Sequence, residues 1–221
     1  MLNSLDASYF LGSVSFYEKQ FEEILSKICL CYKLMKTDKV ILDNKENKIR
    51  DILLLNYLKN NKVRRKFDFI QWHFEREVQE DHSVGRTDIK IISQNTFIHQ
   101  EAYYILECKR LDSVNTTGTT GLNAEYIKNG IARFISKYYS SYYRVNGMIG
   151  FIVEDLKIDE NVERINNLLK TSFSAIETKQ EIVRSSFIDD FEYHYCSIHS
   201  DETNDELKIY HLMLNLSSIV L

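Results

Sequence analysis

The chain has 221 residues, of which 44% are hydrophobic and 27% charged, and its formal net charge at pH 7 is −4. These proportions are typical of a folded globular protein and exclude disorder over most of the chain. The slightly acidic balance gives no general attraction to nucleic acids, so such a partner would have to be recognised by local basic patches.

The first half of the chain predicts two helices and then a three-stranded antiparallel meander. Apolar residues recur at helical spacing over residues 14–36. A second helix is expected to open at Asp43 or Asn44 and to end near residues 60–61, because Asp43 and Glu46 have the spacing of a capping box. The residues assigned to the buried side of this helix are Ile49, Ile52, Leu53 and Leu55. The predicted strands span residues 69–79, 87–93 and 101–111.

The second half of the chain predicts a parallel crossover followed by further helices and a hairpin. A loop rich in glycine and threonine, residues 112–123, leads into a helix at 124–144 and a buried strand at 146–154. A strand, helix and strand in this order favour parallel pairing of the two strands. The remaining predictions are helices at 160–173 and 176–184, and a hairpin formed by residues 191–200 and 206–216.

These elements predict an α/β protein, an α+β sandwich in which a central mixed sheet with an antiparallel meander is flanked by helices. We expect a single domain over residues 1–221. Its predicted parts are an N-terminal helical extension (1–42), a core (43–154), and C-terminal helices with a β-hairpin that complete the fold (155–221).

The four cysteines have neither a disulfide framework nor zinc spacing, which is typical of a reducing compartment. The N-terminus lacks the basic start and apolar run of a signal peptide, and no apolar run approaches the roughly 18 residues needed to cross a membrane. The sequence therefore predicts a cytoplasmic protein with no membrane partner. The six histidines lack metal spacing, and we expect structural roles for them.

Two carboxylates and a lysine are predicted to meet at the ends of neighbouring strands. Glu107 and Lys109 are two apart on one strand and share a face, while Cys108 points into the core. If the preceding strand pairs antiparallel, Asp88 lies beside Glu107. Two such carboxylates repel each other unless a cation lies between them, and oxygen ligands suit Mg²⁺ or Mn²⁺. The pattern predicts a metal site suited to phosphodiester hydrolysis, and the alternative is a salt bridge at the rim of the sheet.

Asp88, followed after a hairpin by Glu-x-Lys at 107–109, resembles the D…(D/E)-x-K core of the restriction-endonuclease-like nucleases, also called the PD-(D/E)XK superfamily. The resemblance covers roughly residues 43–154 and departs at Thr87, where the family often has proline. It implies a restriction-endonuclease-like core and a Mg²⁺- or Mn²⁺-dependent endonuclease. DNA is the substrate that the resemblance implies, in restriction, repair or phage defence.

The resemblance also implies roles for individual residues. Asp88 and Glu107 would bind the metal, with the backbone carbonyl of Cys108 as a further ligand. Lys109 would position or activate the attacking water. Glu46, on the helix before the meander, would join the site, although its capping-box spacing explains the residue without any chemistry.

Basic residues before and after the meander are assigned to substrate binding: Lys62, Arg64, Arg65, Arg133 and Lys137. The first three lie in a basic run at 59–66, whose alternative role is that of a solvated helix end. The last two are four apart on the helix at 124–144, where the alternative is ordinary helix surface. The loop at 112–123 is expected to be the most mobile segment, either a plain connector or a loop that orders on substrate.

A second class of function also fits the sequence, namely a non-catalytic nucleic-acid-binding or assembly subunit that retains the nuclease fold. The N-terminal helix and the C-terminal hairpin would then be assembly surfaces. An acidic chain is expected to bind DNA weakly by itself, which favours a homodimer or a partner protein subunit. A nuclease directed at RNA is a third alternative.

Overall fold

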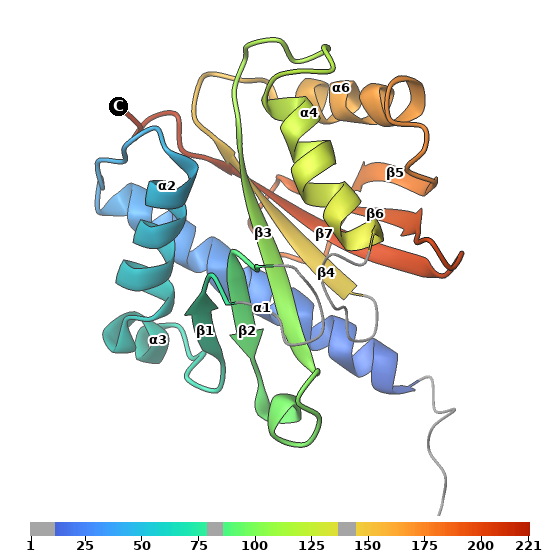
Figure 1. The fold of residues 1–221 in the computed structure, drawn as a ribbon. Coiled ribbons are helices and arrows are strands. Elements are labelled where there is room, and N and C mark those ends of the chain that lie inside the picture. Colours follow the sequence, from blue (N-terminus) through green and yellow to red (C-terminus); the bar gives the residue numbers. More distant parts are fainter. Residues whose placement is uncertain (1–11, 79–85, 137–144) are drawn as a thin grey trace, which may run out of the picture.

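The computed structural model describes residues 12–78, 86–136 and 145–221, with side chains from residue 16 onward. Within these residues, a seven-stranded mixed sheet lies between two layers of helices (Figure 1). The strand order is β1-β2-β3-β4-β7-β6-β5. The strands are β1 (His73–Arg76), β2 (Ile89–Ile92), β3 (Tyr103–Leu111), β4 (Val145–Ile152), β5 (Thr178–Arg184), β6 (His194–Ser200) and β7 (Glu206–Asn215).

The strand pairings confirm the predicted meander, parallel crossover and hairpin. Strands β1, β2 and β3 form the antiparallel meander. Strand β4 is parallel to β3 on one side and to β7 on the other. Strands β6 and β7 form the predicted antiparallel hairpin, and β5 adds the outer edge. The result is the mixed sheet flanked by helices that the sequence predicts.

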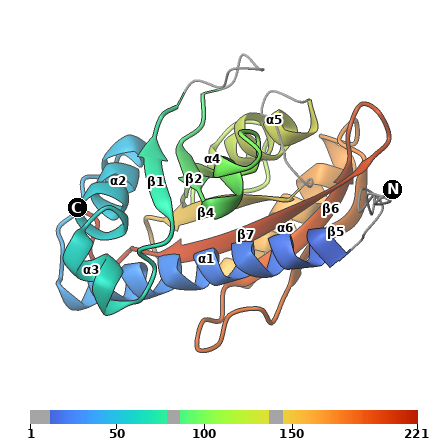
Figure 2. The ribbon, with the colours of Figure 1, turned by 90° about the horizontal axis from the view of Figure 1, so that it is seen from below.

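The helices divide between the two faces of the sheet (Figure 2). Helix α1, helix α2 and segment η1 pack on one face of the sheet. The segments from α4 to α6 cover the other face. No helix in the described parts of the chain is long and apolar enough to cross a membrane. The bounds are α1 (Gly12–Thr37), α2 (Glu46–Ile52), η1 (Leu53–Leu58), α3 (Asn61–Lys66), η2 (Gln94–Phe97), α4 (Leu122–Tyr126), η3 (Ile127–Ile131), α5 (Ala132–Ile135) and α6 (Ile158–Thr171).

The N-terminal helix α1 is a layer of the core. Its residues Phe21, Ile24 and Ile28 are fully buried in the cluster that covers the sheet. At Gly147 of β4 a Cβ atom would lie 2.8 Å from Phe21 Cζ and would also meet a methyl of Leu106, so the close approach of helix and sheet requires glycine. The apolar face of this helix is therefore occupied by the sheet and is not available as the assembly surface expected above.

The opposite core contains a buried chain of polar side chains. The Thr178 hydroxyl donates to a backbone carbonyl, so its Oγ1 accepts from His199 Nδ1 at 3.1 Å. His199 Nε2 then accepts from the Ser197 hydroxyl at 2.8 Å, and Ser197 Oγ accepts from His211 Nε2 at 2.8 Å. The Tyr126 hydroxyl donates to His211 Nδ1 at 2.8 Å. Each polar side-chain atom in this hydrogen-bonded series has a partner when both imidazoles are neutral. This is what buried polar groups require.

Residues 176–184 form strand β5, so the predicted helix there is wrong. Pairing with β6 holds one edge of β5. On its other edge, the side-chain amide of Asn166 in α6 donates to the Ile182 carbonyl and accepts from the Ile182 N–H, both at 2.9 Å. The amide thus substitutes for a neighbouring strand, and this long-range pairing outweighs the helical propensity of the polar segment.

The start of the second helix also differs from the prediction. Helix α2 begins at Glu46, and its N-cap residue is Lys45, which makes no side-chain capping bond, so the capping box is wrong. The helix continues as the π-helical segment η1, whose wider turn shifts the buried face. Leu54 is therefore buried, whereas Leu55, which was assigned to the core, is 45% exposed.

The loop that was expected to be mobile is fastened to the protein. The Thr116 carbonyl accepts from Asn123 Nδ2 at 2.8 Å, and Thr116 Oγ1 accepts from Arg164 Nη1 at 2.9 Å. The Ser113 hydroxyl donates to Glu154 at 2.7 Å. Gly121 ends the loop with a φ of +101°, a conformation that favours glycine. The loop between β3 and α4 is thus held by contacts with α4, with Arg164 of α6 and with Glu154 after β4.

Candidate functional site

The candidate site forms at the first residue of β2, where β3 continues beyond its pairing with β2. Ile89 pairs with Leu106, so the preceding residue, Asp88, lies opposite Glu107. Asp88 Oδ2 accepts from the Cys108 N–H at 2.8 Å. One step further along β3, the Arg110 N–H donates to Glu46 Oε2 at 2.9 Å. Two carboxylates are therefore fixed along the edge of β3 beyond the last β2 pair.

Glu107 is the most deeply buried carboxylate of the cluster, with 1% exposure. Its Oε1 accepts from Lys109 Nζ at 2.6 Å and from Arg133 Nη1 at 3.0 Å. The Cys108 side chain points the other way, into the core beneath α1 and α2. The alternation predicted for this strand is thus confirmed, and it places a carboxylate and an ammonium on the same face.

The Lys109 ammonium lies among three oxygen atoms. These are Glu107 Oε1 at 2.6 Å, the Cys108 carbonyl at 2.9 Å and Glu46 Oε1 at 3.4 Å. Burial lowers the pKa of Lys109, but the negative charges of Glu107, Glu46 and Asp88 outweigh burial and raise this pKa above its usual value. Lys109 therefore stays protonated in this arrangement and acts as a hydrogen-bond donor.

Arg50 belongs to the cluster and was missed in the sequence. It is 2% exposed, and its Nη1 donates to Asp88 Oδ1 at 2.8 Å. Its Nη2 donates to Glu77 Oε1 at 2.8 Å, and its Nε to Asp51 Oδ1 at 3.1 Å. Burial lowers the pKa of Arg50, but the hydrogen bonds to these three carboxylates raise it above its usual value. In the sequence, Arg50 could have been assigned to the site from its spacing to Glu46, because residues four apart on a helix share a face.

The helix after β3 brings Arg133 to the site. The π-helical segment η3 precedes α5, which carries Arg133, and the Arg133 side chain is 32% exposed. At Gly130 a Cβ atom would lie 3.8 Å from Lys109 Cγ and 3.2 Å from Met148 Sδ, and it would also meet the terminal methyl of Met148. The missing side chain at Gly130 lets the helical segment lie directly over Lys109.

The other basic residues assigned to substrate lie elsewhere. Lys62, Arg64 and Arg65 belong to α3, which follows the seven residues of α2 and the six of η1. At a rise of about 1.5 Å per residue, α2 and η1 together span roughly 20 Å, with Glu46 at their first residue and α3 beyond their last. Arg64 is used structurally, since its Nη2 donates to the carbonyls of residues 70 and 72. Lys137 lies outside the described residues.

The oxygen atoms around Lys109 are the type of donor that suits a hard divalent cation. Two carboxylates, Glu46 and Glu107, and the Cys108 carbonyl already converge on one positive charge. Within residues 12–78, 86–136 and 145–221, no group of three or more His, Cys, Asp or Glu side chains is arranged to hold a metal ion. A metal bound by Asp88, Glu107 and the Cys108 carbonyl would draw on two carboxylates and a backbone carbonyl, a mixed donor set that proteins use for Mg²⁺ and Mn²⁺.

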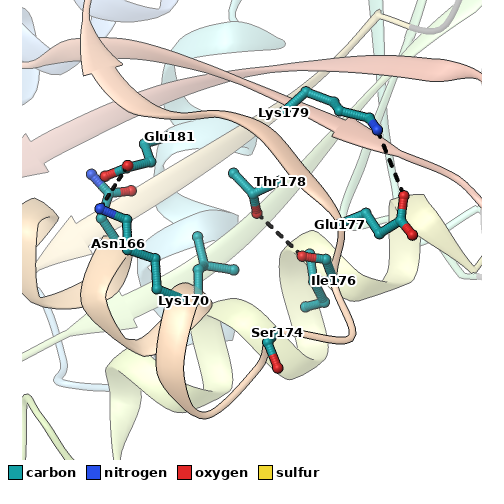
Figure 3. A pocket seen from close by; sticks show the side chains of 9 residues that line it. Asn166, Lys170, Ser174, Ile176, Glu177, Thr178, Lys179 and Glu181 are labelled. Atoms are coloured by element: carbon teal, nitrogen blue, oxygen red, sulfur yellow. Dashed lines mark hydrogen bonds and ion pairs between the residues drawn. The ribbon is translucent and has the colours of Figure 1, made fainter.

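A separate pocket of about 440 Å³ lies between the end of α6 and β5 (Figure 3). Its charged residues pair with one another, Lys170 with Glu181 at 2.7 Å and Lys179 with Glu177 at 3.8 Å. Strand β5 is the far edge of the sheet from β1 and β2. The pocket therefore contains none of the residues of the candidate site.

The structure brings together five of the residues assigned from the sequence, Glu46, Asp88, Glu107, Lys109 and Arg133, and adds Arg50. In comparisons with known proteins, no family model, no curated protein and no solved structure matches the chain. The family resemblance therefore rests on the residues and their geometry.

Proposed function

We propose that the chain is a metal-dependent nuclease with a restriction-endonuclease-like core, and that it hydrolyses phosphodiester bonds in DNA. The observation that carries this proposal is the meeting of Asp88, Glu107 and Lys109 from two adjacent strands with Glu46 from the preceding helix. The order of helix, antiparallel meander, helix and parallel strand over residues 46–152 supports it as well.

In this proposal Asp88, Glu107 and the Cys108 carbonyl hold Mg²⁺ or Mn²⁺. A divalent cation supplies charge neutralisation at the phosphodiester and lowers the pKa of water. Lys109 donates hydrogen bonds to the negative charge that develops on the phosphoryl oxygens, a role that its raised pKa supports. Glu46 holds Lys109 from the α2 side. Arg133, which is part-exposed, contacts a substrate phosphate from the solvent side.

A non-catalytic nucleic-acid-binding or assembly subunit with the same fold is the second candidate. The observation that favours it is that the carboxylates of the cluster already have protein partners. Asp88 pairs with Arg50, Glu107 with Lys109 and Arg133, and Glu46 with Lys109. Such a network neutralises buried charge without any metal.

The experiment that separates the candidates is cleavage of single-stranded and duplex DNA and of RNA in Mg²⁺ or Mn²⁺, with Mn²⁺ binding measured by calorimetry. The variants are Asp88→Asn and Lys109→Met, and the matched control is Lys90→Met. Lys90 lies on β2 with its ammonium over the Tyr103 ring, and it makes no ion pair with Asp88, Glu107 or Glu46.

We expect metal-dependent cleavage by the wild type and by Lys90→Met. We expect a loss of at least about 100-fold in Asp88→Asn and Lys109→Met, with circular dichroism unchanged. If the wild type shows neither cleavage nor Mn²⁺ binding, the enzymatic proposal is overturned in favour of the second candidate. Cleavage of RNA alone would move the substrate to RNA.

A further inference from the structure

We propose that Arg50 is the positioning residue that holds the Asp88 carboxylate in its working orientation. This inference rests on the proposed nuclease function and deepens it. Arg50 is fully enclosed, so it acts through Asp88 and does not touch a substrate.

Asp88 lies just outside the last residue pair of β2 and β3, where the β2–β3 ladder no longer constrains its side chain. Two contacts replace that constraint. Asp88 Oδ2 is held by the Cys108 N–H at 2.8 Å, and Asp88 Oδ1 by Arg50 Nη1 at 2.8 Å. Because the contacts fall on different oxygens, together they fix both the position and the rotation of the carboxylate. Each oxygen keeps a second lone pair for another ligand.

The guanidinium of Arg50 is itself held in place. Its Nη2 reaches Glu77 Oε1 at 2.8 Å and Asp51 Oδ1 at 2.9 Å. Arg76 and Arg86 bind the outer oxygens of Asp51 and Glu77, at 3.0 Å and 2.7 Å. The charges of this network balance, which offsets the cost of burying Arg50.

One helix turn links the two supports of the site. Glu46 and Arg50 are four residues apart on α2, a spacing at which glutamate and arginine often pair with each other. Here each binds the sheet instead, Glu46 at the Arg110 N–H and Arg50 at Asp88. The packing of α2 on the sheet therefore fixes both the position of the Glu46 carboxylate and the orientation of the Asp88 carboxylate.

The fork of a guanidinium is needed for this task. Arg50 spans Asp88 and Glu77 with two different nitrogens, whereas a lysine ammonium is a single point donor at the end of a flexible chain. Arg50→Lys keeps the charge but loses the fork. This substitution therefore tests orientation separately from electrostatics.

The experiment compares Arg50→Lys with the matched control Arg184→Lys in the full chain. Arg184 also bridges two carboxylates, Asp159 and Glu192, but lies on β5 at the far edge of the sheet. The readouts are Mn²⁺ affinity by calorimetry, kcat and KM on a DNA substrate, and thermal unfolding. For Arg50→Lys we expect a 10- to 100-fold loss, as an order of magnitude, in Mn²⁺ affinity and in kcat, with KM within about twofold. Arg184→Lys should match the wild type in all three.

If Arg50→Lys does not fold, the charge-balanced pair Arg50→Gln with Glu77→Gln replaces it, and the same losses are expected. A folded Arg50 variant with wild-type Mn²⁺ affinity and kcat would overturn the positioning role and leave the nuclease proposal standing. A wild type that neither binds Mn²⁺ nor cleaves would overturn both. A fall in Mn²⁺ affinity and kcat confined to the Arg50 variant would support the inference.

Discussion

The Asp88 carboxylate accepts the Cys108 backbone N–H at 2.8 Å, in the position that a β2 carbonyl would take if β2 continued beside β3. A side chain thus completes the backbone hydrogen bonding of β3 at the point where its pairing with β2 stops. The same exchange recurs one step on, where Glu46 accepts the Arg110 N–H. Asp88 and Glu46 therefore complete the hydrogen bonding of β3 in addition to their proposed chemical roles.

The structural role of Asp88 can be measured as hydrogen-exchange protection of the Cys108 amide. Asp88→Ala removes the acceptor, and we expect hydrogen exchange at this amide to accelerate about tenfold, as for the loss of about 1.4 kcal/mol of protection. Asp88→Asn retains an acceptor oxygen and should keep most of the protection while losing cleavage. Equal exchange in Asp88→Ala and the wild type would show that the hydrogen bond contributes nothing to the strand.

Glu107 and Glu46 should differ sharply in their effect on stability. Glu107 is 1% exposed and accepts from two cations, so Glu107→Gln leaves buried positive charge without its counter-charge. We expect a loss of about 3 kcal/mol in the free energy of unfolding by urea. The Glu46 side chain is 30% exposed, and Glu46→Gln should cost less than about 1 kcal/mol. A reversed order would contradict the burial of Glu107.

Arg133 is expected to contribute to substrate binding. Its side chain is 32% exposed and reaches Glu107 from the solvent side. Arg133→Gln should raise KM for DNA about five- to tenfold at low salt and reduce the salt dependence of binding by about one ion. Lys19→Gln, an exposed substitution on α1, is the matched loss of charge and should leave KM unchanged. Equal effects of the two variants would mean that only net charge matters.

The buried histidines predict that the protein loses stability in mild acid. Burial lowers the pKa of His199 to about 4 and that of His211 to about 3, whereas the unfolded chain has the usual value near 6.5. The unfolded state therefore binds protons first, and stability that is complete above about pH 6.5 falls as the pH drops. At about pH 5 each histidine should cost about 2 kcal/mol.

Urea unfolding of the wild type and of a His199→Asn, His211→Gln variant at about pH 7.5 and about pH 5 measures this loss. Carboxylates contribute equally to both proteins, so the difference between their slopes isolates the histidines. The variant should be less stable at neutral pH but lose less on acidification. Parallel losses in the two proteins would contradict neutral, buried imidazoles.

Much of the candidate site could be predicted because it depends on local patterns. The alternation of Glu107, Cys108 and Lys109 along one strand determines which side chains share a face, and the antiparallel pairing of β2 with β3 places Asp88 opposite Glu107. Both follow from the two-residue period of a strand. The parallel crossover to β4 likewise follows from the order of elements.

The parts that were missed depend on contacts between distant segments. Arg50 gives no local signal of burial, because arginine is seldom buried unless partners from elsewhere enclose it. Those partners include Glu77 and Asp88, which come from the meander. Strand β5 was read as a helix because its polar residues favour helices and because its pairing depends on β6 and Asn166.

The amide of Asn166 has a consequence for how copies of this protein can associate. By occupying both backbone groups of Ile182, it blocks the middle of β5, the longer of the two edge strands among the described residues, since β1 has four residues. Within the described chain, a second molecule cannot extend the sheet across β5 without first displacing this side chain. Fibre growth by strand addition at β5 is thereby disfavoured.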